Sequence, residues 1–408
     1  MRKLRKSIKP RKLRKLRKPG NTRKKMKNRD YAGIYTHEIP NNTPAKILKM
    51  KFNINNKTTI FDSPLSTLDS YNPSINNELV TLKSIQRNEL GECNNKNAFL
   101  LKEPLQINVN DRCFTYDKPE AQEFLLNNLR ANKHLNVKKM ITPVQSKANC
   151  WFNTMFVTLF MSDKGRKFFH FFRQLMIEGK QSNGEVIPKN LWNAFSLLNF
   201  AIEACLTGNE YAYVLDTNSI IRQIYSSIPN SYKKNEPYIV GVDDANNPIY
   251  YYDSLMNYLN VNTLSMIIVT ITNNNWKAEI ERRMNKEAHV PHFIVVEICD
   301  AKNQMPGDSG KITNKEASFS INGYTYELDS CAIRDIEQEH FTAVLTCEGK
   351  EMAFDGASFH RIVPMKWKHL LNKNDRWKFK GTEHTADGRP YYWSFMHAYQ
   401  MLFYYRTK

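Results

Sequence analysis

Hydrophobic side chains recur at the spacing of a helix between residues 138 and 260. After Cys150, apolar residues stand at positions i, i+3, i+4, i+7 and i+8, the stripe of a helix packed on a core. Pro119 suits the first turn of an earlier helix. The pattern predicts helices at Lys118–Asn132, Cys150–Met161, Arg166–Glu178, Trp192–Leu206 and Asp253–Leu259, with a break at Ser162–Gly165.

Beyond residue 260 the apolar positions follow a period of two, which predicts strands. The β-branched or aromatic runs are Leu264–Thr272, His292–Ile298, Ala317–Ile321, Tyr324–Leu328, Phe341–Cys347 and Glu351–Phe354. Asn322-Gly323 is a strong hairpin signal, and Glu348-Gly349 is expected to turn the chain between the last two strands. Helices followed by antiparallel strands predict an α+β domain.

The first third of the chain lacks these patterns. Residues 2–29 hold 16 Lys and Arg, so the net charge of +19 for 408 residues falls to +3 for the 379 residues from Asp30 on. Such a block repels itself and buries little apolar surface, so we expect residues 1–29 to be disordered when alone. We interpret residues 30–137 as an N-terminal extension of unknown role and residues 138–408 as the main domain.

The polybasic segment needs an acidic partner if it has one. Nucleic acid, an import receptor and an acidic membrane surface draw on the same charge, and the spacing of the basic residues favours none of them. A solvated tail without a dedicated partner is the remaining alternative.

Apolar runs and cysteine spacing exclude several classes of protein. The longest apolar stretches, Leu264–Ile271 and Trp192–Leu206, fall short of the ~18–20 residues that cross a bilayer. No apolar segment of a secretory signal stands at the N-terminus. Seven cysteines without a CxxC pair indicate neither a disulfide scaffold nor a four-thiolate zinc site. We therefore expect an intracellular protein, cytoplasmic or nuclear, without a cofactor or metal.

Cys150 stands apart from the other cysteines because it begins a helix. A helix N-terminus lowers the pKa of a thiol and places it beside unpaired backbone N–H groups, which suits a nucleophile. The alternative is a cysteine packed as a small apolar residue. That interpretation is kept for Cys93, Cys113, Cys205, Cys299, Cys331 and Cys347.

A nucleophilic cysteine needs a base, usually a histidine oriented by Asp or Asn. A two-residue turn at Glu348-Gly349 pairs Cys347 with Lys350 and, counting outward, Thr342 with Asp355. His340 and Asp355 then become diagonal neighbours on one face of the hairpin, within the ~7–8 Å over which long side chains meet. A surface His–Asp contact is the alternative explanation.

Five segments, taken in order, resemble the ubiquitin-specific proteases, which are papain-like ubiquitin carboxyl-terminal hydrolases. The first is similar to the family's Cys box and the fourth to its His box. The segments are Pro143–Met155 (PVQSKANCWFNTM), Pro291–Ile298 (PHFIVVEI), Tyr324–Leu328 (YTYEL), Glu339–Ser358 (EHFTAVLTCEGKEMAFDGAS) and Ala398–Arg406 (AYQMLFYYR). The resemblance covers roughly residues 138–408. It implies a papain-like fold, with a helical thumb-like half followed by an antiparallel-sheet palm-like half.

The resemblance implies that Cys150 is the nucleophile, His340 the general base and Asp355 the group that orients it. Gln145 falls where the family has its oxyanion donor, and Asn149 and Asn153 are supporting residues of the Cys box. The glycines of that box are missing, and Gly356 replaces a second acidic position. The CxxC zinc ligands of the family's fingers subdomain are absent as well, so a fingers region within residues 207–290 is expected to be metal-free.

The implied activity is cysteine-dependent hydrolysis of the peptide or isopeptide bond after ubiquitin or a ubiquitin-like modifier. Ubiquitin ends in a basic tail, so acidic residues are expected beside the channel, and aromatic residues could roof it; ordinary surface charge and core packing are the alternatives. The candidates are Asp243, Asp244, Asp335, Glu337 and Glu339, with Trp151, Phe341 and Trp393.

Two rival functions remain open. The same triad could serve a protease that processes a structural precursor, or the domain could be an inactive scaffold in a nucleic-acid-binding protein. The Asn- and Lys-rich composition and the divergence from the family would suit a large DNA virus, and association with the virion is then one alternative for the location of the protein.

Overall fold

The computed structural model describes the chain from residue 106 to residue 407 with gaps. The described residues are 106–109, 112–131, 135–145, 147–208, 212, 217–259, 266–271, 273–287, 290–298, 312–336, 340–358, 361–379, 382, 388 and 391–407. The polybasic segment (residues 1–29) and residues 30–105 of the expected N-terminal extension lie outside the described residues.

Helices make up the first half of the described chain. They are α5 (Pro119–Ala131), α6 (Cys150–Phe160), α7 (Asp163–Phe168), α8 (His170–Glu178), α9 (Lys189–Thr207), α10 (Thr217–Ser227), α11 (Asn230–Asn235) and α12 (Pro248–Tyr258). A short antiparallel pair, β1 (Gln106–Val109) and β2 (Arg112–Thr115), precedes them. The helix expected at Arg166–Glu178 is divided at Phe169 into α7 and α8.

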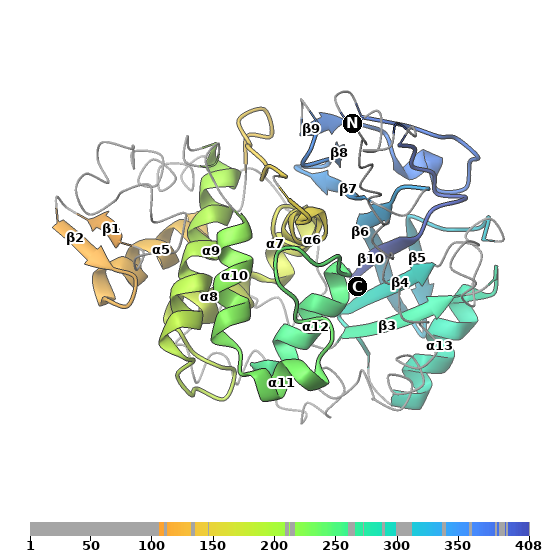
Figure 1. Cartoon of the computed structure of the whole chain (residues 1–408). Helices are drawn as coiled ribbons and strands as arrows, with labels where there is room; N and C mark the ends of the chain where they lie inside the picture. Colours follow the sequence, from red (N-terminus) through yellow and green to blue (C-terminus); the bar gives the residue numbers. More distant parts are fainter. Residues whose placement is uncertain are drawn as a thin grey trace, which may run out of the picture.

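An eight-stranded sheet forms the second half, so the α+β class is confirmed. The strands are β3 (Met266–Ile271), β4 (Phe293–Ile298), β5 (Ser318–Ile321), β6 (Tyr324–Arg334), β7 (Phe341–Cys347), β8 (Lys350–Phe354), β9 (Ile362–Pro364) and β10 (Gln400–Arg406). Their order is β3-β4-β10-β6-β7-β8-β9. Strand β5 lies off this path and pairs with the first residues of β6, Tyr324 to Glu327. Figure 1 shows the sheet on one side, α8–α10 on the other and α6 between them.

The expectation of a wholly antiparallel sheet is wrong at one edge. β3 and β4 pair in parallel, and the helix α13 (Trp276–Glu287) connects them. A parallel pair needs such a crossover, and both strands are almost entirely buried, as strands of parallel sheets usually are. The charged sequence KAEIERRMNKE of α13 carries only a narrow apolar stripe. The spacing of apolar residues therefore did not predict this helix.

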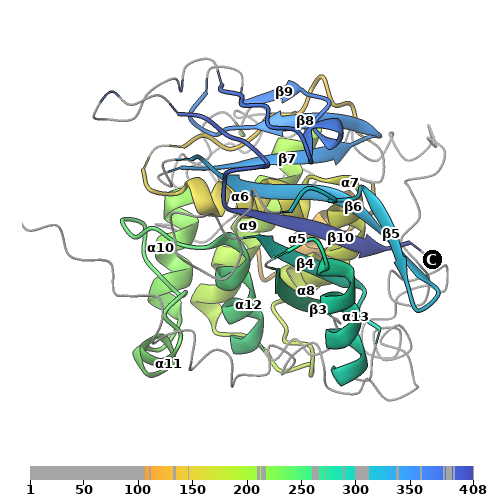
Figure 2. The same ribbon diagram turned by 90° about the vertical axis from the view of Figure 1, so that its right-hand side faces the viewer.

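The sheet separates two hydrophobic cores. Along β4, Phe293 and Val295 face the helical half, whereas Ile294 and Val296 face a second cluster that contains Trp276 of α13. Figure 2, turned by 90°, places α13 beside β3 and α6 behind β6. Each face of the sheet is therefore covered, and the side chains along each strand alternate between the two cores.

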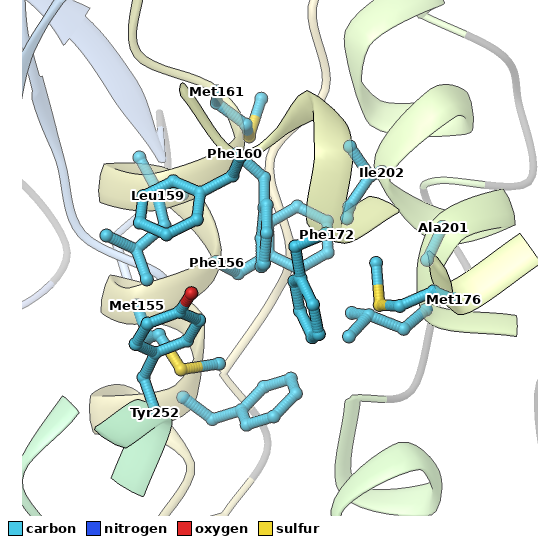
Figure 3. Packing of buried hydrophobic residues seen from close by; sticks show 14 of the residues in the cluster. Met155, Phe156, Leu159, Phe160, Met161, Phe172, Met176, Ala201, Ile202 and Tyr252 are labelled. Carbon is cyan, nitrogen blue, oxygen red and sulfur yellow. The ribbon is translucent and has the colours of Figure 1, made fainter. Parts of the chain in front are cut away.

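Helix α6 fills the space between the helices and the sheet. All its residues from Trp151 to Phe160 are buried, and Figure 3 shows Phe156 and Phe160 turned toward Phe172 of α8. The rings of Phe160 and Phe172 are stacked with centroids 6.4 Å apart. Because the helix is buried on every side, its polar Asn153, Thr154 and Thr158 included, the start of α6 is held from several sides.

The turn between β7 and β8 is fixed by the helical half. Glu348 and Gly349 both have positive φ, 48° and 66°, as a two-residue hairpin turn requires. Asp163 at the start of α7 accepts their backbone N–H groups at 2.7 and 2.9 Å. Arg166 bridges the carboxylates of Asp163 and Glu348, at 2.8 Å to each. This buried network connects the hairpin to α7.

Replacing Asp163 with Ala should destabilise the protein strongly, because the turn N–H groups lose their acceptor and a buried ion pair is broken. We expect the free energy of unfolding to fall by about 3–5 kcal/mol, measured by urea denaturation of the full chain. Glu279→Gln is the control, since it removes an exposed ion pair with Arg282 on α13. A pair of this kind contributes less than about 1 kcal/mol. Equal, small losses in both variants would contradict the role of Asp163.

Candidate active site

Cys150 is the first residue of α6, with a half-buried side chain. Burial alone would raise the pKa of its thiol. A hydrogen bond and the charge of His340, together with the backbone N–H groups of Phe341 and Trp151, outweigh that effect and lower the pKa below its ordinary value of 9.0. The helix N-terminus thus places the sulfur among donors that favour the thiolate.

His340 lies between Cys150 and Asp355. Its Nε2 is 2.7 Å from Asp355 Oδ1, which leaves Nδ1 as the ring nitrogen for the thiol. Burial alone would lower the pKa of His340, but hydrogen bonds to Asp355 and Cys150 raise it to about 10. The two shifts have the directions that favour a thiolate–imidazolium pair, the reactive state of a cysteine nucleophile.

Asp355 is fully buried and keeps its charge. Burial would raise the pKa of this carboxyl, but the hydrogen bond and charge of His340, the backbone N–H of Ala357 and the nearby Thr382 hydroxyl lower it overall. The Ala357 N–H donates to Oδ1, the oxygen that also faces His340, at 3.0 Å. The carboxylate is thus oriented by its own loop before it orients the imidazole.

The register of the hairpin that carries His340 and Asp355 is confirmed. Cys347 pairs with Lys350, and Ala343 pairs with Phe354, so Thr342 and Asp355 are the next opposed pair. The backbone of His340 is held from the other side, because its N–H donates to Asp335 Oδ1 at 2.6 Å. Its ring also packs against Trp393, with centroids 5.9 Å apart.

Gln145 lies on a loop that is fixed to the Asp355 segment. Its backbone N–H donates to the Gly356 carbonyl at 2.8 Å, and its side-chain oxygen is buried without a hydrogen-bond partner. A Cβ on Gly356 would approach Gln145 within 3.3 Å and Asn153 within 3.4 Å. The loop packs directly on residue 356, so a larger side chain there would require the loop to shift.

Asn149 and Asn153 are connected through a residue that the sequence pattern did not single out. The Thr217 hydroxyl, at the start of α10, accepts from Asn149 Nδ2 and donates to Asn153 Oδ1, at 2.8 Å each. Asn153 Nδ2 donates to the Val144 carbonyl at 3.1 Å. All three side chains are completely buried. No motif marked Thr217, since it lies 67 positions after Cys150 and begins another helix.

The acidic candidates fall into three groups. Asp243 and Asp244 are exposed, and Asp243 lies 3.6 Å from Lys147 of the loop before Cys150. Asp335 is completely buried and holds the His340 backbone, which makes it a structural carboxylate and not a channel residue. Glu337 and Glu339 lie outside the described residues.

The aromatic candidates are core residues. Trp151 and Trp393 are completely buried, and Phe341 is nearly so. Trp151 packs on Tyr251 of α12 with centroids 4.6 Å apart, and Phe341 packs on Tyr399. Their side chains therefore belong to the core and not to an exposed surface.

The remaining cysteines of the described chain lack the features of Cys150. Cys205, Cys331 and Cys347 are completely buried, and burial raises the pKa of each thiol. Cys93 and Cys299 lie outside the described residues, as does the side chain of Cys113. Within the described ranges, no three His, Cys, Asp or Glu side chains are grouped as a metal site would need. None of the helices described is both long and apolar enough to span a bilayer.

Comparisons with known proteins add little. No family model and no curated protein matches the chain. Among solved structures, an essential yeast splicing factor resembles it over 76% of this chain and 74% of that one, with 10% identity and a TM-score of 0.32. A likeness of that size supports no conclusion about function.

The pH dependence of the alkylation rate of Cys150 should reflect its pairing with His340. The rate should rise as the pH crosses the lowered pKa of the thiol, below 9.0, and stay level until His340 loses its proton near pH 10. In His340→Ala the midpoint should move above 9.0, because burial remains and the counter-charge is gone. The measurement is the iodoacetamide rate at Cys150, followed by peptide mass spectrometry. His369→Ala, an exposed histidine, is the control; an unchanged midpoint in His340→Ala would contradict the pairing.

Proposed function

We propose that this protein is a cysteine hydrolase with a papain-like arrangement, which cleaves the bond after the C-terminal Gly of ubiquitin or a ubiquitin-like modifier. The observation that carries the catalytic part is the contact of one buried imidazole with a thiol at a helix N-terminus and, at 2.7 Å, with a buried carboxylate. The choice of substrate rests on the resemblance of the five segments to the ubiquitin-specific proteases.

The geometry supports the following reaction. The Cys150 thiolate attacks the carbonyl carbon of the terminal Gly, and the oxyanion is held by the Cys150 backbone N–H and the Gln145 amide. His340 gives its proton to the leaving lysine amine as the C–N bond breaks, which leaves a thioester on Cys150. Neutral His340 then takes a proton from water, whose oxygen attacks the thioester and releases the free carboxylate and the thiolate.

Substrate recognition would use the exposed acidic residues near the Cys loop. Asp243 and Asp244 precede α12, on the thumb-like side, and Asp243 is within reach of Lys147. An arginine of a basic tail that enters beside this loop would replace Lys147 as the partner of Asp243. Arg binds carboxylates through two parallel hydrogen bonds.

A ubiquitin derivative that ends in a propargylamide should form a covalent adduct with the full chain, because its electrophile lies where the scissile carbonyl would be. The adduct should map to Cys150 and be absent in Cys150→Ala. Cys205→Ala is the matched control, since it removes a thiol that is buried in the core.

The outcome separates the candidate substrates. If Cys150 is alkylated rapidly by iodoacetamide but forms no adduct with ubiquitin or ubiquitin-like probes, the deubiquitinase proposal is wrong, and a processing protease is favoured. If Cys150 is inert to both reagents, the catalytic proposal fails as well.

Gln145→Ala should lower kcat by roughly 10²–10³-fold, as loss of one oxyanion donor does in other acyl-transfer enzymes. KM should change little, because the donor acts on charge that develops only in the transition state. Hydrolysis of a ubiquitin C-terminal fluorogenic amide would measure both constants. Gln181→Ala, a glutamine on the loop after α8, provides the comparison, and an equal loss in both variants would contradict the role of Gln145.

A further inference from the structure

The hydrogen bonds around Thr217 have only one consistent direction. The Val144 carbonyl can only accept, so Asn153 turns Nδ2 toward it and presents Oδ1 to Thr217. The Thr217 hydroxyl has a single proton, which it donates to that oxygen. It can then only accept from Asn149, whose Nδ2 lies 2.8 Å away. A backbone carbonyl thus fixes the orientation of the Asn149 amide through two intervening side chains.

In this orientation the Asn149 side chain does not cap α6, although Asn149 stands at the N-cap position. Asn149 is the N-cap residue of α6, where an Asn side chain usually accepts the N–H of the second or third residue of the helix. Here it makes no such bond: its amide is held by Thr217, and its backbone, at φ −100° and ψ 13°, lies outside the β region that capping residues usually adopt. Its Oδ1 is buried without a partner, which costs free energy. The backbone carbonyl of Asn149 accepts from the Asn153 N–H, so the helix begins without a side-chain cap.

The uncapped N–H groups lie at the reacting sulfur. The Trp151 N–H is one of the donors that stabilise the Cys150 thiolate, and the Cys150 N–H is the backbone donor for the oxyanion in the proposed reaction. A capping side chain would occupy the space in front of these groups and compete for their protons. The helix N-terminus thus stays open, and Asn149 Oδ1 remains buried without a hydrogen-bond partner.

We infer that Thr217 is a positioning residue, which holds Asn149 away from the start of α6 and so keeps the first backbone N–H groups of the helix available to the sulfur and the oxyanion. The inference rests on the proposed role of Cys150 as nucleophile. It gives α10 an indirect part in the chemistry, because the hydroxyl that orients the Asn149 amide is the first side chain of that helix.

The test uses the full chain and a near-isosteric change. Thr217→Val removes the hydroxyl and keeps the shape, so the Asn149 amide is released. Once ψ of Asn149 turns from 13° into the β region, the side chain can cap the helix, and the thiol should lose part of its N–H stabilisation. We expect the midpoint of Cys150 alkylation to move to higher pH and the rate at pH 7 to fall about 3- to 10-fold, within the range of helix-terminus effects. Thr217→Ser keeps the hydroxyl and should restore the wild-type profile.

A double-mutant cycle tests the route of the effect. In an Asn149→Ala background no side chain can cap the helix, so adding Thr217→Val should cause no further shift in the alkylation midpoint. An equal shift in both backgrounds would overturn the inference, because Thr217 would then act through packing alone. An unchanged midpoint in a folded Thr217→Val protein, or a Thr217→Ser protein as impaired as Thr217→Val, would also overturn it.

These outcomes are separable from those of the proposed function. Alkylation of Cys150 needs no ubiquitin, so the cycle decides the role of Thr217 even if the ubiquitin probe fails to react. If the probe does react, Thr217→Val should lower kcat about 10-fold with KM nearly unchanged, which loss of packing would not select for. A wild-type kcat together with a wild-type alkylation midpoint would reject the inference and leave the deubiquitinase proposal intact.

Discussion

The arrangement of the site depends on how one carboxylate holds one turn. Asp163 accepts both backbone N–H groups of the β7–β8 turn, and Arg166 pairs with both Asp163 and Glu348 of the turn. A slip of one residue in this hairpin would send His340 and Asp355 to opposite faces. Asp163 belongs to the helix that follows α6 in the chain, so the element that carries the thiol and the hairpin that carries the base share one anchor.

The charges at the site stabilise one another in a buried environment. Burial opposes the charged forms of Cys150, His340 and Asp355, and in each case the neighbouring groups shift the pKa toward the charged form. Removing one member leaves the others buried without compensation, which is costly. The site is therefore organised as a unit, and the open start of α6 fits this scheme because its N–H groups supply further compensation for the thiolate.

The sequence was informative where a local pattern decided the structure. The stripe after Cys150 predicted α6, and a turn at Glu348-Gly349 with strict alternation predicted the register that brings His340 and Asp355 together. The sequence pattern did not predict features that depend on contacts between distant segments. The parallel pairing of β3 and β4 depends on the charged helix α13 between them. Thr217 reaches Asn149 only because α10 packs beside α6. Asp335 was misjudged for the same reason, since only the fold shows that it is buried against the His340 backbone.

The last strand of the chain lies in the middle of the sheet. β10 pairs with β4 on one side and with β6 on the other, so residues 400–406 must arrive before the strand of His340 has its full support. During synthesis, Cys150 emerges 190 residues before its base and longer still before the sheet closes. Cys150 can thus pair with His340 only after most of the sheet has been made, so the proposed nucleophile would gain its base late in synthesis.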